Sequence, residues 1–302
     1  MLIDDIYKEY IYEIRVRNYT ERTIKGYKNN LNKFFTYCKN EYGLLEIEEI
    51  THIHIKQYLN QLKSKGLSES YINTILKNIR CFYAYCYKEE YCLNIAKKVE
   101  FLKEKTVLIN TFTDSEVRKM LDAYRMDTYM NARNKCIISI LLDTGIRNSE
   151  LCNIKNIDVK ETVIYIFGKG RKERIVPISP YLKKIMIRYE RMRDNYLKDN
   201  SLHYDNYFLS YRCKPLTVEA IERVLKIAGQ RARVREGIRC SPHTCRHYFA
   251  QTQLRNGLDI YSLSRILGHE TVEITKRYLE SLKDEQIAEI SIGTSPLMNL
   301  SK

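Results

Sequence analysis

Cationic and imidazole side chains recur in four short stretches of the predicted second domain, each in apolar surroundings that predict burial. The stretches read LLDTGIRNSEL, GKGRKERIVP, SPHTCRHYFA and LSRILGHETVEITKRYLESL. A charge held away from water is very costly unless it has a partner or a ligand. These stretches are therefore the first places to look for a site that binds a ligand or performs chemistry.

The first two stretches have ordinary structural explanations when each is taken alone. Arg147 follows Gly145 at a predicted helix break, and Glu150, three residues on, is a suitable ion-pair partner. Lys169 projects from a predicted basic turn between two β-branched strands, where glycines would let the backbone approach a phosphate. A structural Arg–Glu pair and a solvated turn account for the same residues.

The third stretch predicts a helix that begins at Ser241 and Pro242. His243 then lies in the first turn, where free backbone amides favour anions, and Arg246 shares its helical face. His247 is expected to pack in the core.

The fourth stretch has a helix stop at Gly268, followed by His269 and by Thr271 as a predicted cap. Alone it resembles a helix-turn-helix, which favours a non-catalytic, sequence-specific DNA-binding regulator in which Tyr278 is inert.

Together the four stretches supply the parts for attack on a phosphodiester. Two guanidinium groups can grip the non-bridging oxygens, and a lysine can protonate a leaving alkoxide. A histidine can accept a proton or bond the phosphoryl oxygens, and a tyrosine can hold the phosphate covalently. No carboxylate cluster with metal-ligand spacing is visible, which argues against two-metal nuclease chemistry, so we expect no cofactor and no metal.

The boxes TGIRNSEL, GKGRKERIVP, HTCRH, LGHETVEIT and RYLE, in this order, resemble those of the tyrosine recombinase (phage-integrase, Xer-like) family. The resemblance extends over almost the whole chain and implies the catalytic residues Arg147, Lys169, His243, Arg246, His269 and Tyr278. By motif, the arginines clamp the phosphate, Lys169 protonates the leaving 5′-oxygen and Tyr278 is the nucleophile. The histidines act in acid–base catalysis (His243) and bond the phosphate (His269), and Glu150 supports them. Cys245 and Glu280 depart from the family's usual Leu and His at secondary positions.

The resemblance implies a site-specific DNA recombinase that works through a 3′-phosphotyrosyl link and a Holliday junction, without ATP. The expected partners are double-stranded DNA with recombination sites and three further copies of the chain on that DNA. A type IB topoisomerase-like relaxing enzyme would use the same covalent chemistry. Chromosome-dimer resolution and integration or excision of a mobile element both stay open. The chain starts directly with core-binding-like helices, so a separate arm-binding domain is not expected.

The predicted fold is mainly α with a small β-sheet. Residues 1–98 are expected to form an all-helical, SAM-like core-binding domain, 99–112 a linker and 113–302 an α+β catalytic domain. An exchange tail from about 283 is expected to dock on a neighbouring protomer or on its own domain. Expected DNA contacts are Lys25, Lys28 and Lys33 and, on the hairpin, Arg171, Lys172 and Arg174.

The charge balance agrees with a nucleic-acid partner. The net charge is +14, with +4 in residues 1–106 (18 Lys and Arg against 14 Asp and Glu) and +10 in the rest. The N-terminus lacks a signal-peptide pattern and no apolar run reaches membrane length, so the protein is expected in the cytoplasm, on the nucleoid, and away from membranes. The nine cysteines are odd in number and form no CxxC pair, which argues against a disulfide framework or structural zinc.

Overall fold

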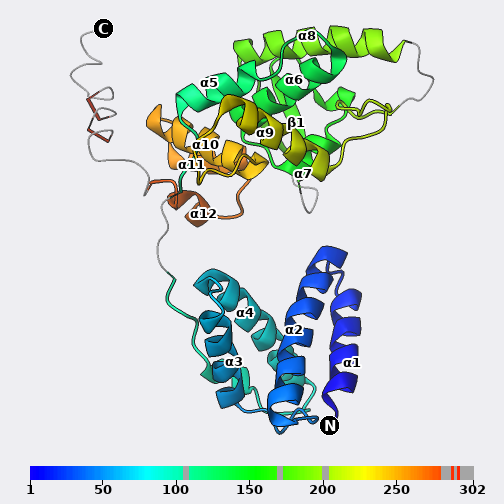
Figure 1. The fold of residues 1–302 in the computed structure, drawn as a ribbon, viewed down its shortest axis with the longest axis vertical. Helices are drawn as coiled ribbons and strands as arrows, with labels where there is room; N and C mark the ends of the chain where they lie inside the picture. The colour runs from blue at the N-terminus through cyan, green and yellow to red at the C-terminus, as the bar shows by residue number, and fades with distance from the viewer. Residues whose placement is uncertain (105–108, 169–172, 199–203, 280–286, 289–290, 293–302) are drawn as a thin grey trace. The chain divides into compact units, whose positions relative to one another are not determined.

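The computed structural model divides into two compact units, residues 1–106 and 107–302 (Figure 1). It describes residues 1–104, 109–168, 173–198, 204–279, 287–288 and 291–292. The architecture is mainly helical with one two-stranded sheet, which confirms the predicted fold class.

The first unit packs four helices around an apolar core: α1 (Ile3–Val16), α2 (Glu21–Tyr42), α3 (His52–Ser64) and α4 (Glu69–Lys88), followed by the 3₁₀ turn η1 (Ile95–Lys98). The predicted apolar stripes are confirmed, because Leu31, Phe34 and Phe82 are fully buried. Helix α2 begins at the predicted cap, where the Thr20 hydroxyl accepts a hydrogen bond from the Thr23 amide at 3.2 Å.

The segment between the units contributes side chains to both cores. Val99 belongs to the core of the first unit, and the amide of Leu102 donates to the side chain of Asn73 at 2.8 Å. Phe112 belongs to the core of the second unit. The ends of the segment expected as a linker are therefore packed residues.

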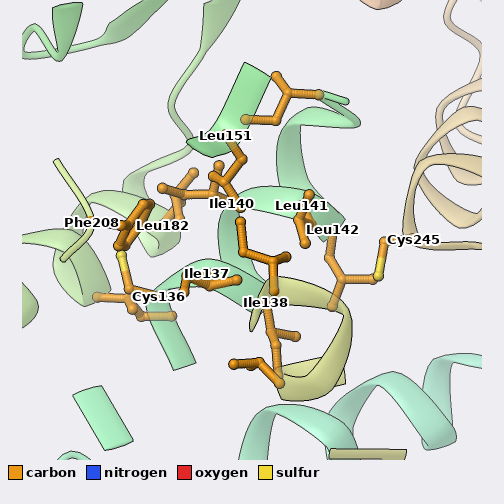
Figure 2. Close-up of a cluster of buried hydrophobic side chains, with 14 of the residues drawn as sticks. Cys136, Ile137, Ile138, Ile140, Leu141, Leu142, Leu151, Leu182, Phe208 and Cys245 are labelled. Carbon is orange, nitrogen blue, oxygen red and sulfur yellow. The ribbon is translucent and has the colours of Figure 1, made fainter. Parts of the chain in front are cut away.

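The second unit is built around a buried central helix. Its helices are α5 (Asp114–Asp122), α6 (Tyr129–Thr144), α7 (Asn148–Asn153), α8 (Pro180–Leu197), α9 (Val218–Ala232), α10 (Pro242–Arg255), α11 (Ile260–Leu267) and α12 (Glu273–Lys276), with the 3₁₀ turn η2 (Asn156–Asp158). Apolar side chains of α6 pack against Leu151 of α7, Leu182 of α8 and Cys245 of α10 (Figure 2). Helix α6 thus holds together the helices that carry the candidate site.

The sheet is an antiparallel hairpin of β1 (Val163–Phe167) and β2 (Glu173–Pro177), with Ile164 paired to Val176. These are the two predicted strands, and residues 169–172 of the predicted turn between them lie outside the described residues. Among the described residues no helix is long and apolar enough to cross a membrane. All nine cysteines are free thiols.

Candidate active site

Arg147 lies just after the glycine that ends α6. Gly145 takes a left-handed conformation (φ +60°) that stops the helix, and Arg147 becomes the N-cap of α7. Glu150 accepts hydrogen bonds from the Arg147 amide at 2.7 Å and from its Nη1 at 2.9 Å, which confirms the predicted ion pair. Nη2 donates to the carbonyl of Gly268, and 43% of the side chain remains exposed, so this guanidinium is open to a ligand.

Arg174 lies in a different environment from the solvent-facing DNA contact we expected. On β2 it points to the same side as the buried Val176, two residues on, because side chains alternate along a strand. Its guanidinium donates two hydrogen bonds to Glu150, at 2.8 and 2.6 Å, and Nε donates to the carbonyl of Ile266. Only 11% of this side chain is exposed, so its charge is used inside the protein.

Glu150 therefore joins two guanidinium groups. Burial raises the pKa of its carboxyl, but the hydrogen bonds and charges of Arg174 and Arg147 outweigh burial and bring the pKa to about 2. The carboxylate stays ionised and fixes Arg147 relative to the hairpin.

Arg246 on α10 is held by the ends of two other helices. Nη1 donates to the carbonyl of Gly145 and Nη2 to that of Leu267, both at 2.8 Å. Carbonyls at helix C-termini carry partial negative charge and attract cations. Burial, followed by the charge of Arg147, lowers the pKa of Arg246 to about 10. Because the charge of Arg147 opposes that of Arg246, an anion bound beside both would stabilise this site.

His269 follows the left-handed Gly268 at the end of α11, as predicted. Its Nδ1 lies 2.7 Å from the hydroxyl of Thr275. Burial and the charges of Arg246 and Arg147 lower the pKa of His269 to about 4, so the ring is neutral near pH 7 and can hydrogen-bond a phosphate oxygen. The predicted cap at Thr271 is wrong, because α12 begins at Glu273 with Val272 as N-cap.

Tyr278 is a core residue in this structure. It is 2% exposed and packs with Phe249, Leu263 and Leu267. Its hydroxyl oxygen lies 2.9 Å from Nδ1 of His247, and burial raises the pKa of the phenol although Arg246 and Arg277 oppose the rise.

His243, at the start of α10, is exposed, and its ring packs edge-on against His247 with centroids 4.1 Å apart. Partial desolvation on the side that faces the protein, followed by the charges of Arg246 and other arginines, lowers the pKa of His243. His243 and Tyr278 thus both contact His247. His247 is buried, which confirms its expected core packing. Its contact with Tyr278, 31 residues away, was not predicted from the local sequence pattern.

The second unit brings together Arg147, Glu150, Arg246, His269, Tyr278 and His243. Lys169, Arg171 and Lys172 lie outside the described residues, as does nearly all of the tail from 283. Lys25 and Lys33 are exposed and Lys28 is half-buried on α2 of the first unit.

The helix-turn-helix interpretation is wrong. Helix α12 has only four residues, and Tyr278 behind it is buried rather than displayed to a DNA groove.

Comparison with known proteins places this geometry in a family. The model of the phage integrase family matches residues 110–285, and that of the phage integrase N-terminal SAM-like domain matches 6–93. Tyrosine recombinase XerC of Thermodesulfovibrio yellowstonii is 31% identical over 264 residues, which cover 86% of this chain and 85% of that protein.

Two solved structures share the fold. The XerH recombinase in a post-cleavage complex with palindromic difH has a TM-score of 0.76 at 21% identity, covering 92% of this chain and 82% of that one. A lambda integrase tetramer bound to a Holliday junction has a TM-score of 0.73 at 16% identity, covering 95% and 78%. The chain therefore belongs to the phage integrase family of tyrosine recombinases, enzymes that recombine DNA at specific sites.

Proposed function

We propose that Tyr278 cleaves duplex DNA at a phosphate held by Arg147 and Arg246. The observation that carries this proposal is the pair of guanidinium groups fixed by the carbonyls of Gly145, Leu267 and Gly268 beside a neutral His269. A phosphodiester would bring a further negative charge to these cations beside Glu150, and the arginines would stabilise the charge that develops on its oxygens.

In this proposal the Tyr278 oxygen attacks phosphorus and forms a 3′-phosphotyrosyl link, while the 5′-oxygen leaves. Lys169, by its motif, protonates the leaving oxygen. The 5′-hydroxyl of a partner duplex then attacks the link and frees Tyr278. Bond energy is kept in the phosphotyrosine, so the reaction needs no nucleotide hydrolysis.

The assembly and the division of the chain belong to the same proposal. Residues 1–98 would bind DNA through Lys25, Lys28 and Lys33, 99–112 would link the domains, and 113–302 would carry catalysis. Four protomers would act on two sites through a Holliday junction, supported by the lambda integrase tetramer of the same fold. The tail from about 283 would join protomers, and the protein would act on DNA of the nucleoid.

The test is covalent attachment to DNA. Duplexes selected by the protein from a random-sequence pool are nicked beside each candidate phosphate, so that the cleaved end diffuses away and the adduct accumulates. The wild type should form an SDS-resistant adduct and Tyr278→Phe none, while Tyr261→Phe, at an exposed tyrosine of α11, should match the wild type. An adduct with Tyr278→Phe would reject the nucleophile, and no adduct with wild type on bound DNA would reject the proposal.

Arg246→Lys tests the phosphate clamp separately. Lysine cannot keep both carbonyl contacts and also bind a phosphate in two-pronged fashion, so adduct formation should fall about 100-fold or more. Arg255→Lys, on the exposed end of the same helix, is the matched control. Relaxation of plasmids that carry no selected site would indicate a topoisomerase instead.

A further inference from the structure

The hydroxyl of Tyr278 is paired with an imidazole that no motif assigned to catalysis. Its oxygen lies 2.9 Å from Nδ1 of His247, and the two rings meet edge to face with centroids 5.5 Å apart. His247 is 9% exposed and Tyr278 is 2% exposed. Because bulk water barely reaches this hydroxyl, a proton that leaves it must first pass to a group already in contact.

Tyr278 has to lose that proton in order to act. Burial raises the pKa of the phenol, so near pH 7 it rests as a neutral hydroxyl, which is a weak nucleophile. A base within hydrogen-bond reach can accept the proton as the bond to phosphorus forms. His247 meets that distance requirement, and because its ring is neutral, Nδ1 can accept a proton in the tautomer protonated at Nε2. Burial and nearby cations make the free ring a weak base, and the negative charge of a bound phosphodiester would raise its pKa when the proton has to be taken up.

His247 also contacts a solvent-facing histidine. Helix α10 places His243 and His247 one turn apart, and their rings are in contact. His243 is exposed, whereas Tyr278 is buried. His247 therefore contacts both the buried nucleophile and an exposed ring.

We propose that His247 is the catalytic residue that receives the Tyr278 proton during strand cleavage, with His243 as the next group toward solvent. The inference rests on the proposed cleavage by Tyr278. It moves direct contact with the nucleophile from His243, where the family resemblance placed acid–base catalysis, to the histidine four residues later.

The proton and the bonds balance as follows. The Oη–P bond forms while the P–O5′ bond breaks, the phenol proton moves to Nδ1 of His247, and the 5′-oxygen takes a different proton from the proposed donor Lys169. In rejoining, a 5′-hydroxyl attacks phosphorus and gives its proton back to the proposed group Lys169, the Oη–P bond breaks, and His247 returns its proton to Oη.

The first test uses the free protein and does not depend on cleavage. The chain has six histidines, so ¹⁵N spectra can be assigned with single substitutions. Nδ1 of His247 should resonate as an unprotonated, hydrogen-bonded nitrogen, and its signal should shift in Tyr278→Phe. A protonated Nδ1 would make His247 a donor to the phenol and would overturn the inference.

The second test measures adduct formation on the selected nicked duplex. In His247→Asn the side-chain amide can keep a hydrogen bond but cannot take up a proton, so the rate on bound DNA should fall about 100-fold or more. In His247→Leu, which removes both functions, the rate should fall at least as far. His52→Asn, the same substitution on α3, is the control and should keep the wild-type rate. If His247→Asn forms the adduct as fast as the wild type does, the inference is rejected. The proposed function still stands in that case, because the wild-type protein forms the adduct.

A substrate with sulfur at the bridging 5′ position separates the two proton transfers. A thiolate leaves without being protonated, so this substrate should restore cleavage to Lys169→Ala but not to His247→Asn. Recovery of His247→Asn would assign its defect to the leaving group and overturn the inference. If the wild type forms no adduct on either substrate, the proposed function fails instead.

Discussion

The carbonyl oxygen of Gly145 lies 2.8 Å from Nη1 of Arg246, although 101 residues separate them in the chain. Two residues after Gly145 the chain reaches Arg147. One left-handed glycine therefore ends α6, supplies an acceptor for the buried arginine and directs the chain toward the second arginine. The geometry of the candidate phosphate clamp depends on this single backbone turn.

Gly145→Ala should damage both stability and cleavage. A Cβ here would lie 2.5 Å from Cδ1 of Phe249, in a backbone conformation that itself costs about 1–2 kcal/mol for a residue other than glycine. We expect a loss of roughly 3 kcal/mol in urea unfolding, from strain and overpacking together. Gly257→Ala is the control, because its φ is also positive (+87°) but nothing lies within 4 Å. Equal losses in both variants would show that crowding by Phe249 is unimportant.

Glu150→Gln should destabilise the protein, because Arg147 and Arg174 lose the carboxylate that they share. The side chain of Glu150 is 6% exposed and that of Arg174 is 11% exposed, so the neutral amide leaves a buried guanidinium without its anion. Breaking a buried pair in this way costs about 3–5 kcal/mol, measured by urea unfolding. Glu161→Gln, which breaks the pair of an 85% exposed carboxylate with Lys183, should change stability by less than about 1 kcal/mol.

The ionisation of Glu150 should also contribute to the loss of folding stability in acid. The folded pKa of Glu150, about 2, lies below its ordinary 4.5, so its contribution is present above pH 4.5 and is lost as pH falls toward 2. Glu150→Gln should therefore flatten that part of the stability curve. An unchanged slope below about pH 4.5 would contradict the assignment.

His247 should make the protein less stable in mild acid. Its pKa falls from 6.5 to about 3 because the ring is buried and faces His243, Arg277 and Arg246. Unfolded chains take up the proton as pH drops below 6.5, whereas the folded ring does not, so stability present at neutral pH is lost as pH falls. From about pH 7 to about pH 5 the loss from this ring is about 2 kcal/mol. Thermal unfolding of His247→Asn over the same range should show a correspondingly smaller fall.

Local chemistry made much of this structure predictable. The caps at Thr20 and Ser241, the stops at Gly145 and Gly268 and the Arg147–Glu150 pair depend on residues within a few positions of each other, and all are present. The order of the five motifs predicted the family and its catalytic residues, because that order does not depend on contacts between distant segments.

The contacts that the sequence did not predict join distant segments. Arg174 lies in a run of basic residues that reads as one exposed patch, and only the strand pairing shows that it faces inward to Glu150. His247 and Tyr278 meet because α10 and the chain after α12 fold against α11, and such an approach leaves no mark in either local pattern. The carbonyl acceptors of Arg246 could not be predicted from the sequence either, since every residue carries a backbone carbonyl.

Lys25 and Lys33 should govern salt dependence more than catalysis. Both are exposed on α2. If each contacts a phosphate, Lys25→Gln with Lys33→Gln should reduce the slope of log affinity against log salt by about 2, while adduct formation on saturating DNA is retained. Lys88→Gln, at an exposed lysine paired with Glu89, should leave the slope unchanged. An unaltered slope in the double variant would remove this face of α2 from the DNA interface.

The main-chain anchoring of Arg246 has an evolutionary consequence. Its two acceptors, on Gly145 and Leu267, belong to the backbone and persist through any side-chain replacement that preserves the path of the chain. Glu150, in contrast, can be lost in one mutational step. Homologous chains can thus drift far apart in sequence around this arginine and still hold it in place, provided that both helices keep ending where they do.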